Sequence, residues 1–276
     1  MKPYLLFFLC LLASRLAAQD IYDYQHSRAY ARYLLQSQQY VLAAEEYERL
    51  IFLRPENDTL RADLLRAYRR AETPERGLEQ WAKWQLTPRP KTRLLYTEYS
   101  RLLLRGGYPD QARELALSAE VIDSTQKRRT LLYANMLEQK WTDARKSLEA
   151  IPASEKISRR TEVEKLILRG ERAKKKNPWV ATALSVPVPG LGKVYAGEWK
   201  DGIISLLFVG LNTWQAYRRF DKEGLDTFWG WIHGGFAIGF YGGSLYGSHK
   251  AARRHNKQQF NRLQHETEAL VFPVLD

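Results

Sequence analysis

Four small residues recur at a nearly constant spacing in the first half of the chain, and this regularity constrains the fold more than any other feature. They are Ala43, Gly77, Ala112 and Ala144, and the intervals between them are 34, 35 and 32 residues. A fixed period of roughly 20–50 residues is typical of repeat architectures. Around Ala43 the sequence reads Y-x-x-A-x-x-x-Y-x-x-L before Pro55, which places the second Tyr and the Leu on one face of a helix that the proline ends.

This period and this pattern resemble the tetratricopeptide repeat, a helix-turn-helix unit of 34 residues. The resemblance covers about 24–152, and the unit around Ala43 fits best. Later units depart from the pattern, because Gly77 stands where Ala is usual, Pro74 lies near the inter-helix turn and the fourth unit is short. We expect an all-α fold, with a TPR-like α-solenoid made of eight helices. Their expected ranges are 28–38, 41–53, 59–71, 75–86, 92–105, 109–121, 128–138 and 141–150.

The resemblance implies that the solenoid binds peptides or partner proteins on a concave surface, so the first expected partner is a protein. Each helix pair in such an array buries its apolar face only by stacking on its neighbours. We therefore expect Trp81, Trp84 and Trp141 to be packing residues. The arginine-rich faces are expected to be solvated surface. They contain Arg61, Arg66, Arg69, Arg70, Arg101 and Arg105.

A small α-helical membrane domain is expected over 178–250, where charges become few. Its three apolar stretches are 179–192, 202–217 and 228–249. A helix of about 22 residues is about 33 Å long, enough to cross a hydrocarbon core, so the third stretch could span. The second is marginal, and the first is broken by prolines and is typical of a re-entrant or interfacial segment. We expect two or three apolar helices here.

Glycines recur every fourth residue in the third apolar stretch, at Gly235, Gly239, Gly243 and Gly247. Such a row forms a smooth ridge on one helix face and lets helices pack closely in lipid. In water each glycine would weaken the helix by about 1 kcal/mol. The ridge therefore predicts helix packing, against the second stretch or against another copy of the chain, so a homo-oligomer is a further expected interaction.

The connection between the first two apolar stretches reads P-G-x-G-x-x-Y-x-G. With the apolar helix that follows, it resembles a small two-helix membrane domain of unknown function that occurs in bacterial envelope proteins, notably of the Bacteroidota. The resemblance covers about 178–250 and implies a topology but no activity. The glycines are expected to allow tight turns at the membrane surface. The residues of this turn motif are Pro189, Gly190, Gly192, Tyr195 and Gly197.

The chain carries 43 Lys and Arg against 31 Asp and Glu, a net charge of +12. Two basic clusters flank the apolar region, and such clusters are typical of membrane edges, so lipids are expected partners. Nucleic acid is not expected as a partner, because no nucleic-acid-binding motif accompanies the charge. The membrane-edge basic residues are Lys174, Lys175, Lys176, Lys250, Arg253 and Arg254.

The N-terminus has the order of a secretory signal, with Lys2, an apolar run over 5–13 and small residues up to Ala18. An uncleaved anchor is the alternative. Export predicts a membrane-associated protein of the bacterial cell envelope with periplasmic repeats, whereas the basic flanks favour the cytoplasm, so the topology stays open. The expected domains are the signal peptide 1–19, the repeats 20–152, a helical linker 153–177, the membrane domain 178–250 and a basic, then polar tail 251–276.

No pattern of catalytic or metal-binding residues is present. The single Cys lies in the signal, and the five His lack metal-site spacing. Gly190-x-Gly192-Lys193 is no phosphate loop, because the required first Gly and the final Ser or Thr are Pro187 and Val194. We therefore expect a non-enzymatic protein-binding scaffold with no cofactor and no metal. The alternative is a membrane enzyme or transport component, with a site near Lys193, Tyr195, Trp199, Asp201 and His233.

Overall fold

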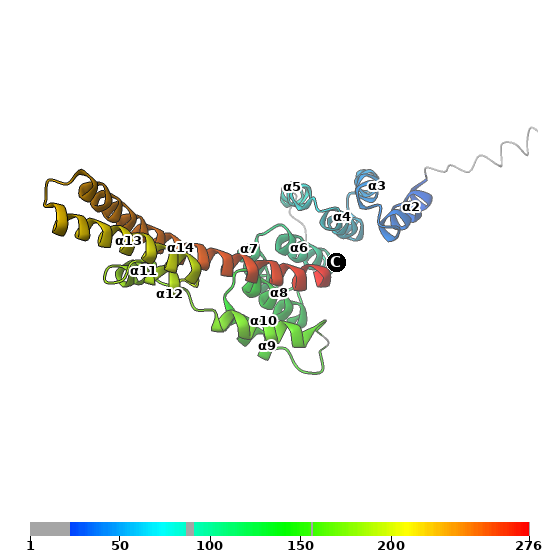
Figure 1. The fold of residues 1–276 in the computed structure, drawn as a ribbon. Helices are drawn as coiled ribbons and strands as arrows, with labels where there is room; N and C mark the ends of the chain where they lie inside the picture. Colours follow the sequence, from blue (N-terminus) through cyan, green and yellow to red (C-terminus); the bar gives the residue numbers. More distant parts are fainter. Residues whose placement is uncertain (1–22, 87–90, 156, 276) are drawn as a thin grey trace, which may run out of the picture. The chain divides into compact units, whose positions relative to one another are not determined.

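The computed structural model describes residues 23–86, 91–155 and 157–275. Regular secondary structure within these ranges is helical throughout, which confirms the all-α class (Figure 1). The expected signal peptide at 1–19 lies outside the described residues. The chain forms two compact units. Unit 1 contains the described residues up to Arg160 together with those from Ala269 onward, and unit 2 contains Thr161–Glu268.

Unit 1 contains the eight helices expected from the repeat pattern. Two of them begin four residues before the expected start, because Asp23 and Asp123 act as N-caps, their carboxylates accepting the backbone N–H groups of His26 and Gln126. The observed helices are α2 (Tyr24–Gln36), α3 (Tyr40–Leu53), α4 (Asp58–Arg70), α5 (Pro74–Gln85), α6 (Arg93–Arg105), α7 (Pro109–Ser118), α8 (Ser124–Leu137) and α9 (Trp141–Glu149).

The turn inside each helix pair has the same backbone conformation in all four units. Its central residue has a positive φ: 63° at Gln38, 57° at Glu72, 81° at Gly107 and 56° at Gln139. These positions are again 34, 35 and 32 residues apart. After each of them, the next N–H donates to a carbonyl five residues earlier, as Gln39 N does to Leu34 O at 2.9 Å. This is the Schellman ending of a helix, so the sequence period is also a structural period.

The small residues of the repeat lie where helices approach each other. Ala43, Ala112 and Ala144 are fully buried. At Gly77 in α5, an added Cβ would lie 2.7 Å from the Leu102 side chain in α6, closer than two carbons can come. Helix α6 contacts both α4 and α8, so the first helices of the last three pairs lie side by side.

Unit 2 begins with α10, which lies in the expected linker, and ends in a helix much longer than expected. The segment 251–276, expected to be a tail, is helical instead, because α14 continues through Leu275. The continuation follows from the sequence, which has no Gly or Pro between 251 and 272 and buries Ala251, Ala252 and Leu263. The helices are α10 (Arg160–Arg172), α11 (Pro178–Ser185), α12 (Leu191–Tyr195), α13 (Trp199–Glu223) and α14 (Phe228–Leu275).

Small side chains form the buried core of unit 2. Ala181 in α11 and Ala251 in α14 are fully buried. Beside them the Ser185 and Ser248 hydroxyls are 2.7 Å apart, and Ser185 Oγ accepts the Gly192 N–H at 2.9 Å. These bonds join α11, α12 and α14 without bulky side chains between them.

Candidate functional site

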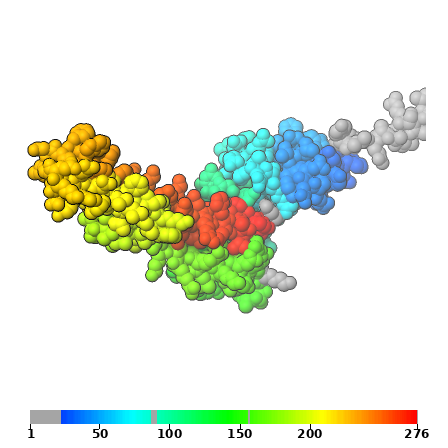
Figure 2. Space-filling model, in the orientation of Figure 1, coloured from blue at the N-terminus to red at the C-terminus, as the bar shows by residue number. Residues whose placement is uncertain are grey.

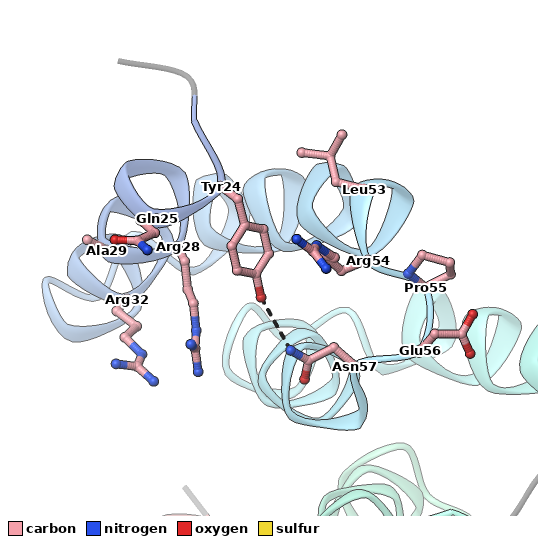
Figure 3. Close-up of a pocket in the computed structure, with 10 residues that line it drawn as sticks. All are labelled: Tyr24, Gln25, Arg28, Ala29, Arg32, Leu53, Arg54, Pro55, Glu56 and Asn57. Atoms are coloured by element: carbon pink, nitrogen blue, oxygen red, sulfur yellow. Dashed lines mark hydrogen bonds between the residues drawn. The ribbon is translucent and has the colours of Figure 1, made fainter. Parts of the chain in front are cut away.

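Two arginines on α2 project to the same side of the helix, one turn apart (Figure 3). Neither the Arg28 nor the Arg32 guanidinium forms an ion pair or hydrogen bond with another residue that the structure describes. Both line an open surface cavity of about 850 Å³ between α2 and the connection from α3 to α4. Unpaired guanidiniums with five donors each make this cavity a place for an anionic group.

On the other side of the cavity, Tyr24 contacts Asn57 and Arg54 (Figure 3). Its hydroxyl accepts a hydrogen bond from Asn57 Nδ2 at 3.3 Å. The Arg54 guanidinium lies 5.3 Å from the centre of the Tyr24 ring, a cation–π contact. Arg54 is therefore a third arginine that borders the cavity, and its contact with the Tyr24 ring fixes the position of its side chain.

A buried tyrosine hydroxyl lies close to the same arginines. Tyr47 in α3 is fully buried, and its hydroxyl has no hydrogen-bond partner among the described residues. Burial raises the pKa of Tyr47 to about 12, and the Asp63 charge adds to the rise, while Arg32, Arg66 and Arg28 oppose it. An unpartnered buried hydroxyl costs stability, and Tyr47 keeps a hydrogen-bond donor without a described partner, although its side chain does not line the open cavity.

Three arginines surround one buried carboxylate on the neighbouring helices. Glu98 in α6 accepts from Arg66 Nη2 at 3.1 Å, Arg69 Nη2 at 3.1 Å and Arg101 Nη1 at 2.9 Å. Burial alone would raise the pKa of Glu98, but the charges of Arg69, Arg101 and Arg66 hold it below its usual value. Arg66 also pairs with Asp63 at 3.2 Å, so three positive charges face two negative charges in this part of unit 1.

The expectation that all the arginine-rich faces are solvated is wrong at two positions. Arg69 is fully buried, in the ion pair with Glu98. Arg61 is 6 % exposed and lies 4.9 Å from the ring centre of Trp84. A guanidinium can be buried when a carboxylate or an aromatic face replaces water, and here Glu98 comes from a helix 29 residues further on.

We call the side chains of Arg28, Arg32, Tyr47, Asp63 and Arg66 the arginine site. The pKa of Asp63 is raised by burial, against the charges of Arg66, Arg32 and Arg28. The site can bind a carboxylate, but it contains no nucleophile paired with a base. Within the described ranges no three His, Cys, Asp or Glu are grouped so as to hold a metal ion. Sequence reasoning missed Arg28 and Arg32, and their i, i+4 spacing was the signal for them.

The turn motif lies where three helices of unit 2 meet. Gly190 has a φ of +90°, and a Cβ there would lie 2.1 Å from the Gly202 carbonyl oxygen. A Cβ at Gly192 would lie 1.8 Å from the Ala181 carbonyl oxygen, and Gly197 has a φ of +94°. Tyr195 Oη accepts the Asn177 N–H at 3.3 Å. The glycines permit these turns and close contacts, and the location of the motif at a membrane surface stays a prediction.

The predicted glycine ridge has no packing partner within the described chain. An added Cβ at Gly235, Gly239 or Gly243 would meet no described atom within 4 Å, and at Gly247 it would meet the Lys193 side chain. The reason is that α13 packs on other residues of α14, for example through Phe208 and Phe240. Packing of the ridge on another copy of the chain stays a prediction.

The two basic clusters lie next to each other in unit 2. The Asn256 side chain accepts the Lys176 N–H and donates to the Lys176 carbonyl, both at 2.8 Å. This clasp joins the segment 174–176 to the part of α14 that carries Lys250 and Arg253. Arg254 forms an ion pair with Glu198 at 3.0 Å.

The residues of the alternative enzyme site do not come together. Lys193 Nζ donates to Ser205 Oγ at 2.8 Å, and that hydroxyl donates to the Asp201 carbonyl rather than approaching its carboxylate. His233 contacts Asn212, at 3.2 Å, further along α13.

The expected spans at 202–217 and 228–249 lie in α13 and α14. Among the residues that the structure describes, no helix combines the length and the apolar character needed to cross a membrane.

Comparisons of the chain with protein-family models, with curated proteins and with solved structures give no match.

Proposed function

We propose that the chain is a non-enzymatic scaffold of the bacterial cell envelope. Its first eight helices form a TPR-like solenoid that binds an acidic segment of a partner protein, and unit 2 holds the solenoid at a membrane. The observation that carries the proposal is the pair Arg28 and Arg32, whose guanidiniums form no ion pair or hydrogen bond with the described residues and border an open cavity.

The chemistry of the arginine site favours a carboxylate-bearing segment as the ligand. Arg28 and Arg32 present several N–H donors to one cavity, and guanidiniums pair with carboxylates by two parallel hydrogen bonds. The nearby Tyr47 hydroxyl supplies a further donor that lacks a partner within the described chain. A protein segment with Asp or Glu side chains matches this set and brings apolar groups for the rest of the cavity.

The test is a pull-down of the tagged full chain from mild-detergent membrane extracts, with mass spectrometry of the bound proteins. We expect a stoichiometric envelope protein to be recovered with the wild type and to be lost with Arg28→Glu/Arg32→Glu, because the two charges are reversed. Recovery should also fall as salt rises. Tyr47→Phe keeps the ring and removes only the hydroxyl, so it should weaken recovery several-fold without unfolding the chain.

The matched control is Arg76→Glu/Lys83→Glu, which reverses two exposed cations on α5. It makes the same change in net charge away from the arginine site, and recovery should stay as in the wild type. Equal recovery with the α2 and the α5 variants would show that the arginine site does not bind the partner.

Exposed apolar side chains support the membrane part of the proposal. On α13, Leu207, Leu211 and Trp214 are 53 %, 57 % and 55 % exposed, and on α14 Trp231 and Ile238 are 64 % and 75 % exposed. Apolar side chains that face outward on neighbouring helices mark an interaction surface. The basic clusters beside this surface suit anionic lipid headgroups.

A further inference from the structure

The end of α14 packs on the repeat helices. Residues 269–275 belong to unit 1, and Figure 2 shows this red segment against the green helices of the same unit. Val271 is fully buried, and Leu275 and Leu270 are 3 % and 8 % exposed. Two turns of helix therefore bury three large apolar side chains.

Side chains of α6 and α8 form the surface beneath this segment. Val274 and Leu275 line a cavity together with Leu104 of α6 and with Thr130 and Tyr133 of α8. The cavity still has a volume of about 140 Å³, so the segment does not fill the space. We call this surface the α6–α8 face.

Arginines lie along the segment from its first residue to its last. The Arg105 guanidinium lies 4.3 Å from the centre of the Phe272 ring, and Arg159 Nη1 is 3.5 Å from the Ala269 carbonyl oxygen. Arg101 and Arg129 line the same cavity as Val274 and Leu275. Because the C-terminal end of a helix carries a partial negative charge, Arg101 and Arg129 favour a helix that binds with that end in the cavity.

Two features weaken the binding of residues 269–275 to the α6–α8 face. Pro273 lies inside its last turn and has no N–H to donate to the helix. The rest of α14 up to Glu268 belongs to the other compact unit, so only a short piece contributes to unit 1. A longer or bulkier apolar helix could fill the remaining space and so replace this short segment.

We propose that the α6–α8 face is a binding site for the C-terminal end of an apolar helix, and that residues 269–275 occupy it until a competing helix displaces them. Its lining includes no member of the arginine site, although Arg101 shares Glu98 with Arg66, and its ligand is apolar rather than acidic. The proposal therefore goes beyond the proposed function and does not depend on Arg28 or Arg32.

The test measures binding of a fluorescent, C-terminally amidated peptide with the sequence of 260–275 to the full chain. In Val271→Lys a charged side chain replaces a fully buried one, which should release the chain's own segment. We expect the peptide to bind this variant at least tenfold more tightly than the wild type. The control His265→Lys changes a side chain that is 84 % exposed and should bind as the wild type does. Equal affinity for Val271→Lys and the wild type would overturn the proposal.

Hydrogen exchange of the wild-type chain keeps the proposal testable if Val271→Lys does not fold. Saturating peptide should speed the exchange of amides in 269–275 and leave those of α6 and α8 protected. A peptide that carries the same Val-to-Lys change should have no effect. Unchanged protection of 269–275 at saturating peptide would show that the segment is a fixed part of unit 1.

Discussion

At the scale of single residues, Glu98 organises the charges of unit 1. Its two oxygens accept from three guanidiniums, and one of these belongs to the fully buried Arg69. Breaking a buried ion pair costs more than the pair itself contributes, because the remaining charge has lost both water and its partner. This carboxylate therefore decides whether α4 and α6 can pack as they do.

Glu98→Gln should lower the free energy of unfolding by about 3–5 kcal/mol at neutral pH. The pKa of Glu98 in the folded chain lies below its ordinary value of 4.5, so the stabilising effect of its charge is present above that value and is lost as the pH falls through the folded pKa. Urea unfolding of both proteins at pH 7 and pH 3.5 checks this.

The difference between wild type and Glu98→Gln should shrink at the lower pH. The pKa of Asp63 is raised, first by burial and also by the Glu98 charge, so its protonation at low pH favours the folded state, and more so in the wild type than in Glu98→Gln. A difference that is constant over this range would contradict the role given to the Glu98 charge.

The sequence allowed the small residues of the repeat to be predicted, but not the buried charges. Ala43 and Gly77 stand out because their spacing is regular and their size alone explains their place. The burial of Arg69 depends on Glu98, which lies 29 residues away in the sequence and comes close only after two helices have packed. No local pattern reveals such a pair.

At the scale of elements, the turns contain backbone positions that only a few residue types can occupy. Gly190 has a positive φ and lies close to the backbone of Gly202. Glycine is needed there for two reasons, because it adopts a positive φ without strain and because it has no side chain to collide with Gly202. The helix positions in unit 1 were predictable because each boundary has a local cause, such as Pro74 and Pro109 at the first helical position. The starts of α2 and α8 were missed because their capping Asp residues lie before the apolar pattern begins.

Gly190→Ala should destabilise unit 2 by at least about 2 kcal/mol, because it adds a strained left-handed residue and a clash. Gly210→Ala is the matched control, since a Cβ there meets nothing described within 4 Å and lies inside α13. The control should be neutral or more stable by up to about 1 kcal/mol. Thermal unfolding of the full chain by circular dichroism measures both. Similar midpoints for the two variants would show that the turn tolerates a side chain.

At the scale of the whole molecule, the chain is built as two units that share one helix. Most of α14 belongs to unit 2, and its last residues belong to unit 1. The composition of the sequence indicated a boundary near 153–177, but the packing of 269–275 on the repeat helices was not predicted. Such a return is a contact between distant segments, and only the apolar residues Leu270 and Val271 in a polar region hinted at it.

Membrane attachment is a prediction for the complete chain. The protein, kept in mild detergent and mixed with anionic lipid vesicles, should float with them after the detergent is removed. Leu207→Glu/Leu211→Glu should lower the bound fraction severalfold, because it places two charges on the exposed apolar surface of α13. The matched control Phe52→Glu/Leu86→Glu changes side chains that are 86 % and 84 % exposed in unit 1. Equal flotation of the two variants would remove α13 from the attachment surface.

The four left-handed turns of unit 1 affect how a chain of this kind can evolve by duplication of helix pairs. Each turn is closed by backbone bonds inside its own helix pair, as at Gln38 and Glu72. Duplication of one pair in the gene would therefore add a complete structural module whose internal geometry does not depend on its neighbours. Surface residues such as Arg28 and Arg32 could then diverge between modules while the shared turn geometry stays the same.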